Sequence, residues 1–190
     1  MSTKINQQVL AKNLIDGSSL KFSEAGASTV TIGNEFHAVR KARLTLTDFS
    51  IAVTAANDYG GSKLLDLPDR NLMLLGVEVD CVVTKQGNTN GIVAATDLDM
   101  AIGTATASNA TLSSTMVNVI EKVDIDGDSL TVDFEAHSND NSSSTFPLRV
   151  ADSATAALYM NIAAAVTANS SVTVTGTIDI FYVDLGNLSS

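Results

Sequence analysis

SVTVTGTIDIFYVDLG, residues Ser171–Gly186, alternates apolar and polar side chains over most of its length. Four aliphatic residues fall on one side of an extended backbone, and four polar residues fall on the other. These residues are Val172, Val174, Ile178 and Ile180, and Thr173, Thr175, Thr177 and Asp179. A period of two residues is typical of a strand with one face in a core and the other in water. The stretch therefore predicts a half-buried antiparallel strand.

Comparable ribbons recur along most of the chain, with turn sequences between them. The predicted strands are Ser28–Gly33, Arg43–Val53, Lys63–Pro68, Leu72–Thr84, Ile92–Gly103, Thr115–Ile125, Ser129–His137 and Ala154–Val166, followed by Ser171–Gly186. The turns are rich in glycine and asparagine, and one holds an Asp-Gly pair, which is a hairpin signal. No long helix is indicated. About eight substantial strands predict an all-β fold, an antiparallel β-sandwich, and favour a jelly roll over an immunoglobulin-like pair of sheets.

Three of these stretches carry more specific expectations. The apolar residues of Arg43–Val53 are Leu44, Leu46, Phe49, Ile51 and Val53. The strand alternation of these apolar residues shifts by one position after Leu46, so a β-bulge at Thr47 and Asp48 would keep all five facing the core. The stretch TATASNATLSST is expected to be a loop or a sheet edge. In Ala154–Val166, alternation of Leu158, Met160 and Ile162 with Tyr159, Asn161 and Ala163 favours a strand despite the many alanines.

Cys81 is the single cysteine of the chain, so it has no partner for an internal disulfide. It lies in MLLGVEVDCVV, where strand alternation places it on the same side as four apolar residues. These are Met73, Leu75, Val77 and Val79. We interpret Cys81 as a small hydrophobic core residue rather than a reactive thiol.

The chain divides into an N-terminal arm, residues 1–41, and a sandwich domain, residues 42–190. The arm lacks sustained alternation. Thr3–Ile15 has apolar residues near helical spacing and Gly17 at a suitable stop position, so it forms either a short helix or a loose arm.

The charge of the chain is unevenly distributed. The net charge is −10, which disfavours binding to nucleic acid. Residues 1–47 carry +3, however, and the remainder carries −13. This asymmetry is either ordinary surface variation or a sign of docking onto an acidic neighbour, such as another copy of the chain. Arg40, Lys41 and Arg43 are the candidate residues for such a contact with a neighbouring subunit or another acidic partner.

No apolar run approaches the roughly 20 residues that a transmembrane helix needs, so no membrane partner is expected. The first residues are too polar for a secretory signal. The chain is therefore expected to carry no export signal of its own.

DIDGDSLTVDFE, residues Asp124–Glu135, is the one motif with chemical content. Asp124, Asp126 and Asp128 match positions one, three and five of a calcium loop, and Glu135 matches position twelve. The sixth position holds serine instead of glycine, and both flanks resemble strands. A hairpin turn with solvated aspartates is the better interpretation, and a weak calcium site stays open.

The sequence contains none of the usual signatures of catalysis. His37 and His137 lie outside zinc-protease motifs, and we interpret both as surface residues. Neither a GxSxG elbow nor a phosphate-binding glycine loop is found. Neighbouring acids such as Asp133 and Glu135 mark the wet side of a strand, as i and i+2 positions do. We expect no enzymatic activity, no catalytic residue and no cofactor.

Three stretches of the chain cover about half of its residues and share one further property. They are RLTLTDFSIAVTAANDYGGSKLLDLPDRNLMLLGVEVD, DLDMAIGTATASNATL and LYMNIAAAVTANSSVTVTGTIDIFYVDLGN. Their texture resembles a group of small virion structural proteins from tailed bacteriophages. The resemblance implies a β-sandwich subunit of the capsid decoration or cement type, which binds the outer surface of a phage head and stabilises it. It further implies a major capsid protein as partner, assembly of several copies with trimers favoured, synthesis in the host cytoplasm and a final place on the capsid surface.

Two alternative classes stay open. The chain could be a glycan-binding module associated with a phage tail or fibre, in which case the polar loop His137–Thr145 would carry recognition. It could also be a bacterial surface β-sandwich protein stabilised by calcium. Glycan-array binding would favour the first, and a melting temperature lowered by a chelator would favour the second.

Overall fold

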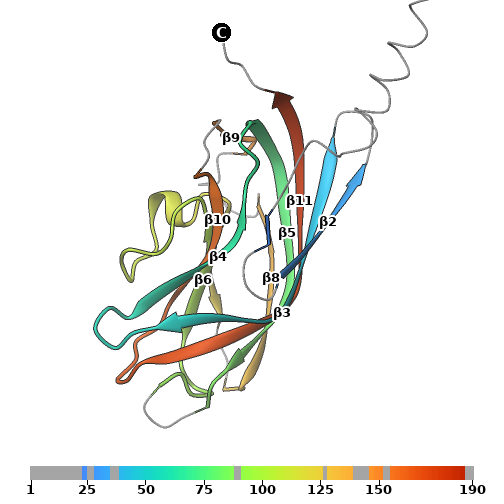
Figure 1. The fold of residues 1–190 in the computed structure, drawn as a ribbon. Helices are drawn as coiled ribbons and strands as arrows, with labels where there is room; N and C mark the ends of the chain where they lie inside the picture. Colours follow the sequence, from blue (N-terminus) through green and yellow to red (C-terminus); the bar gives the residue numbers. More distant parts are fainter. Residues whose placement is uncertain are drawn as a thin grey trace, which may run out of the picture.

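The computed structural model describes residues 23–24, 28–34, 39–87, 91–125, 128–138, 146–151 and 155–186. Nearly all regular structure in these ranges is strand (Figure 1). The strands are β1 (Ser23–Glu24), β2 (Ser28–Asn34), β3 (Arg40–Val53), β4 (Tyr59–Asp66), β5 (Asn71–Lys85), β6 (Leu98–Gly103), β7 (Ile120–Ile125), β8 (Thr131–His137), β9 (Leu148–Val150), β10 (Ala157–Ala163) and β11 (Ser170–Gly186). Within the described ranges there is one 3₁₀ turn, η1 (Ser114–Met116), which lies between β6 and β7. Among the described residues, no helix is long and apolar enough to span a bilayer.

The strands form two antiparallel sheets. The five-stranded sheet has the order β1-β4-β10-β6-β7, and the six-stranded sheet has the order β2-β3-β11-β5-β8, with β9 also paired to β5. The pairing brings distant parts of the chain together: β3 lies beside β11, β4 beside β10, β5 beside β8 and β6 beside β7. The predicted all-β antiparallel sandwich is confirmed.

One hydrophobic core fills the space between the sheets. The alternation of Ser171–Gly186 is confirmed on its core side, since Val172, Val174, Ile178 and Ile180 are each at most 1% exposed. Tyr182 continues the same face and is fully buried. Each such aliphatic side chain contributes about 1.5–3 kcal/mol of burial free energy. The strand is central in its sheet because both of its edges are paired, to β3 and to β5.

The predicted bulge in β3 is present. Val174 pairs with Phe49 and Gly176 pairs with Leu46, so Thr47 and Asp48 together face one residue of β11. Asp48 adopts φ 49°, and its backbone N–H donates to Thr175 Oγ1 at 3.1 Å. The extra residue restores the inward phase, which is why the five apolar residues of β3 are all buried.

A second bulge, in β5, corrects one expectation. Phe181 pairs with Gly76 while Tyr182 pairs with Leu74, so one residue of β5 is extra. Leu74 therefore faces the core, and Met73 and Leu75, which were expected beside Cys81, are partly exposed and lie outside the core cluster. Simple alternation from Cys81 back to Met73 ignores this extra residue, so it assigns the residues of the first half of β5 to the wrong faces of the sheet.

Cys81 lies in the core as predicted, with 2% of its surface exposed. Burial raises the pKa of its thiol to about 12. The thiol also donates to the Thr177 carbonyl at 3.6 Å. A thiol that is buried and protonated behaves as a small hydrophobic side chain.

Part of the outer face of the five-stranded sheet is also covered. The segment 104–119, which includes η1, crosses that face beside β6 and β10 (Figure 1). Leu112 packs there with Ala101 and Ala163 in a second apolar cluster. The predicted loop is thus confirmed, and β7 begins at Ile120 rather than at Thr115.

The first residues of the chain contribute to both sheets where they are described. β2 pairs with β3 along seven residues, which confirms the strand predicted at Ser28–Gly33, and β1 pairs with β4. The predicted helix Thr3–Ile15, its stop at Gly17 and His37 lie outside the described residues. The division at residues 41 and 42 stays a prediction.

Candidate interaction surface

The outer face of the six-stranded sheet is uncovered by other described segments, unlike that of the five-stranded sheet. Along its central strand β11, three threonines point outward: Thr173, Thr175 and Thr177. Most of their direct neighbours on β3 and β5 are uncharged: Thr45, Ser50, Val82 and Thr84, with Asp80 beside Thr177 as the exception. Two positive residues, Lys41 and Arg43, lie on β3 at one side of β11, together with Asp48 at the bulge, and negative residues lie on β5 and β8 at the other side.

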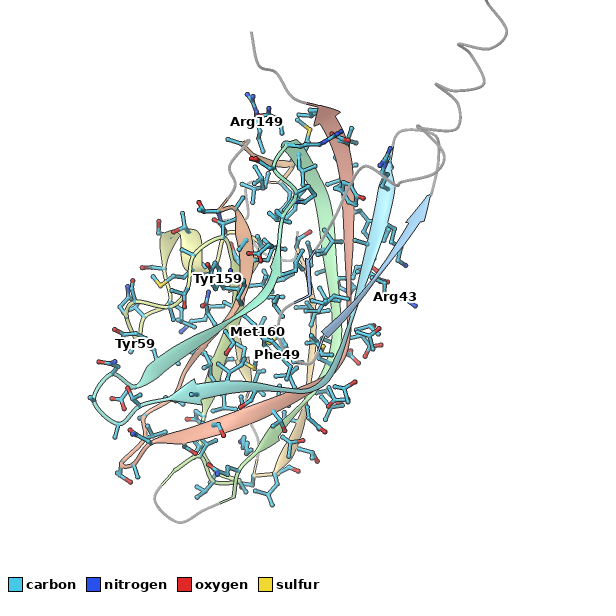
Figure 2. All side chains as sticks on the ribbon, in the orientation of Figure 1. Arg43, Phe49, Tyr59, Arg149, Tyr159 and Met160 are labelled. Carbon is cyan, nitrogen blue, oxygen red and sulfur yellow. The ribbon has the colours of Figure 1, made fainter. Side chains whose placement is uncertain are left out.

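Lys41 and Arg43 converge on Asp179, and we call these three residues the ion-pair cluster (Figure 2 labels Arg43). Arg43 Nε and Nη2 donate to the two carboxylate oxygens at 2.7 and 2.5 Å, and Lys41 Nζ lies 2.7 Å from Asp179 Oδ2. Lys41 Nζ also lies 5.3 Å from the centre of the Phe181 ring. A bidentate arginine and a stacked ammonium hold the carboxylate in one orientation.

Asp179 is the residue of this cluster whose environment the sequence did not reveal. Its side chain is only 9% exposed, although strand alternation places it on the wet face. The hydrogen bond from Arg43 holds the pKa of the Asp179 carboxyl below its usual value, and Lys41 adds to the effect, against a smaller opposing effect of burial. The same contact raises the pKa of Arg43. Asp179 was hidden because its partners lie 136 or more residues away in sequence.

Arg40 is separated from the other two candidate contact residues. Neighbouring residues of a strand point to opposite faces, so Arg40 lies on the side of Tyr182, which it opposes across β3 and β11. Burial raises the pKa of the Tyr182 hydroxyl, and the positive charge of Arg40 works against that rise. The structure therefore brings Lys41 and Arg43 together and places Arg40 beside a buried tyrosine. Their role in contacts stays a prediction.

Replacing Asp179 with asparagine is expected to lower the free energy of unfolding by about 1–2 kcal/mol at pH 7, because two charge-assisted contacts are lost. A carboxyl whose folded pKa is depressed stabilises the fold above its unfolded pKa, near 3.9, and this contribution disappears as pH falls through the folded value. Urea unfolding of wild type and Asp179→Asn should therefore converge in acid. Asp66→Asn is the control, since Asp66 pairs with Lys63 at the surface and should change little. A gap between wild type and Asp179→Asn that persists unchanged at pH 2 would contradict the assignment.

Four exposed carboxylates form what we call the acidic strip. They are Glu78, Asp80, Asp133 and Glu135. Asp80 lies directly opposite Glu135 across β5 and β8, and Glu78 lies opposite His137. His137 is exposed, as expected of a surface residue. Like charges directly opposite each other in a sheet are unfavourable, so this strip is a site of local electrostatic conflict.

A hollow of about 710 Å³ lies on the other side of the molecule, over the five-stranded sheet. It is lined by small side chains, by Asp58, Asp97, Asp99 and Asp124, and by Lys122. Lys122 Nζ binds Asp99 Oδ2 at 2.9 Å, and Asp58 Oδ1 accepts from the backbone N–H of Val166 at 3.1 Å. Two of the four carboxylates are thus engaged within the chain.

The calcium-loop motif is divided between the two sheets. Asp124 belongs to β7 and lies opposite Asp99 in the five-stranded sheet. Glu135 belongs to β8 in the six-stranded sheet, where it lies opposite Asp80. Asp126 lies outside the described residues. Among those that are described, no three or more His, Cys, Asp or Glu side chains gather in a way that could hold a metal ion.

The fold and the surface define an antiparallel β-sandwich protein with one charged sheet face and one hollowed face. No protein-family model and no curated protein matches the chain. Among solved structures, one similar chain comes from the "Cyanophage Pam1 capsid asymmetric unit", with 14% identity and a TM-score of 0.31 over 85% of this chain and 89% of that one. Another is a family 11 carbohydrate-binding module from Clostridium thermocellum in complex with a β-1,3-1,4-mixed-linked tetrasaccharide, with 9% identity and a TM-score of 0.23 over 89% and 91%. At these TM-scores neither likeness assigns a function.

Proposed function

We propose that this chain is a structural virion protein of the capsid decoration or cement type. In this proposal it is made in the host cytoplasm, binds the outer surface of a phage head through the major capsid protein, and stabilises the head without catalysing a reaction. The observation that carries the proposal is the outer face of the six-stranded sheet, which no other described segment covers. Its short threonine side chains lose little conformational entropy when a partner contacts them, and its fixed charges orient that partner on the face.

The strand order supports a jelly-roll version of the sandwich. Leaving aside β1, β2 and β9, eight strands remain, and the first pairs with the last, the second with the seventh, the third with the sixth and the fourth with the fifth. A long hairpin that is rolled up gives this nested pairing, which is the jelly-roll arrangement found in viral capsid and lectin domains. The same fold carries many functions, so the surface has to decide among them.

The many equivalent binding positions on a phage head support a mechanism in which each copy binds only weakly. A phage head presents hundreds of equivalent positions, so a modest affinity per copy suffices when neighbouring copies also touch. In this mechanism the residues before Ser23 lie over the capsid or over a neighbouring subunit. They hold three lysines, Lys4, Lys12 and Lys21, against one acid, Asp16.

Deleting residues 1–22 tests this mechanism and leaves β1 and β2 in place. Truncation at Ala42 would remove the strand that pairs with β3, so loss of binding could then reflect damage to the sheet. We expect the shorter deletion to keep the circular dichroism and melting temperature of the full chain. We also expect it to lose co-purification with the major capsid protein, identified by mass spectrometry from infected cells. If the deleted chain still coats heads normally, the arm mechanism is wrong; if the full chain never travels with heads, the virion function is wrong.

The hollow over the five-stranded sheet supports a second candidate, a glycan-binding module of a phage tail or fibre. Its carboxylates can accept hydrogen bonds from sugar hydroxyls, and its volume lies within the range of small-ligand sites. Glycan-array binding that Asp97→Ala abolishes would favour this candidate over decoration.

A further inference from the structure

We propose that a second copy of this chain packs against the outer face of the six-stranded sheet, with a two-fold axis along β11. This face offers apolar surface as well as charge. Met73, Phe181 and Val183 are partly exposed and lie outside the core cluster. Val183 pairs with Met73, and Phe181 lies under Lys41, so the three extend the ion-pair cluster along the strands.

Apart from Asp48, which lies on β3 beside Thr175, the charges of this face are divided by β11. In the order β2-β3-β11-β5-β8, the cations Lys41 and Arg43 lie on one side and the acidic strip lies on the other. A rotation of 180° about an axis along β11 brings β3 of one copy over β5 and β8 of the other. Because a two-fold contact is reciprocal, each copy then sets its cations against the other copy's acids.

The residues on the axis suit a close approach. Thr173, Thr175 and Thr177 are short and carry no charge, which lets two sheets pack at the usual spacing of about 10 Å. Phe181 and Val183, further along β11, then lose exposed apolar surface in the same contact. The only charged residue on the outer face of β11 between Thr173 and Val183 is Asp179, which its own chain pairs with Lys41 and Arg43, and the flanks of the interface are complementary.

The isolated chain also carries two features that a second copy would resolve. Asp80 and Glu135 are like charges directly opposed in the sheet, and cations brought by a partner remove that conflict. The Arg43 side chain is still 49% exposed although it binds Asp179, so it has donors available for a second carboxylate. The first feature places excess negative charge on this face, and the second offers further N–H donors of Arg43 to a carboxylate of the partner.

The test measures association of the full chain by sedimentation velocity and light scattering at low and high salt. We expect a dimer that weakens as salt rises. The variant Glu78→Lys with Glu135→Lys should raise the dissociation constant about tenfold or more, because both reciprocal contacts become repulsive. The matched control is Asp97→Lys with Asp124→Lys, which makes the same change in net charge on the other sheet and should leave the dimer intact.

A second experiment mixes two charge-reversed variants and tests whether they restore the contact between them. The acidic partner carries Lys41→Glu, Arg43→Glu and Asp179→Asn, and its fold is checked by circular dichroism. Neither it nor the double-lysine variant should self-associate, yet the two should form a heterodimer when mixed. If the acidic variant does not fold, the comparison of the double-lysine variant with its control still decides.

Three outcomes overturn the inference. They are a monomer at about 100 µM, a trimer that the double-lysine variant leaves intact, and a dimer that responds equally to the control. Such a pair differs from the three-fold arrangement that the resemblance implies, and sedimentation separates the two. The measurement uses the isolated chain, so its failure leaves head binding untouched, and failure of head binding leaves the dimer untouched.

Discussion

Asn161→Ala is expected to lower the free energy of unfolding by about 3–5 kcal/mol, because one buried amide makes three hydrogen bonds that water cannot replace. Asn161 is fully buried in β10. Its Oδ1 accepts from the Ala107 N–H at 2.7 Å, and its Nδ2 donates to the carbonyls of Ala105 and Met116 at 3.0 and 2.8 Å. These bonds fasten the segment 104–119 to the outer face of the five-stranded sheet.

The expected consequence is local as well as global. Without the amide, residues 104–119 lose their fixed attachment, so their backbone N–H groups should exchange with solvent faster than those of β11. Urea unfolding gives the first quantity and hydrogen exchange gives the second. Asn109→Ala is the matched control on the same segment, because its side chain makes only an exposed local bond to Thr111. A loss below about 1 kcal/mol for Asn161→Ala would refute this role.

Gly176→Val should be at least as damaging, with a loss of about 3 kcal/mol or more. Gly176 adopts φ +149°, a conformation that side-chain-bearing residues rarely take. It lies opposite Cys81, and a Cβ at this position would sit 2.6 Å from the Cys81 Cα and collide with the Asp80 carbonyl. The substitution would therefore push β11 away from β5 at the centre of the sheet.

The control for this variant is Thr173→Val in the same strand. It gives the same shape of side chain on the outer face, where space is available, so the free energy of unfolding should change by no more than about 0.5 kcal/mol. Thermal unfolding and urea titration both measure the difference. If Gly176→Val unfolds at the same urea concentration as wild type, the close approach of the two strands is wrong.

The sequence predicted which side of most strands faces the core, because alternation with a period of two is written into consecutive residues. Alternation also predicted the bulge at Asp48, because the five apolar residues of β3 can all face the core only if one residue there is extra. Alternation failed in β5, because the apolar residues there also fit an uninterrupted pattern and gave no sign that Leu75 is an extra residue. It also treated Asp179 and Asn161 as wet-side residues, although both are buried.

The chain by itself thus determined the all-β class, the core face of β11 and the burial of Cys81, all of which depend on local pattern. Only the tertiary structure decided that Lys41 and Arg43 share Asp179 while Arg40 does not, that Asn161 fastens a distant segment, and that the cations and the acidic strip flank one strand. These features depend on which strands become neighbours and in what register. That pairing joins residues far apart in sequence, so no local period records it.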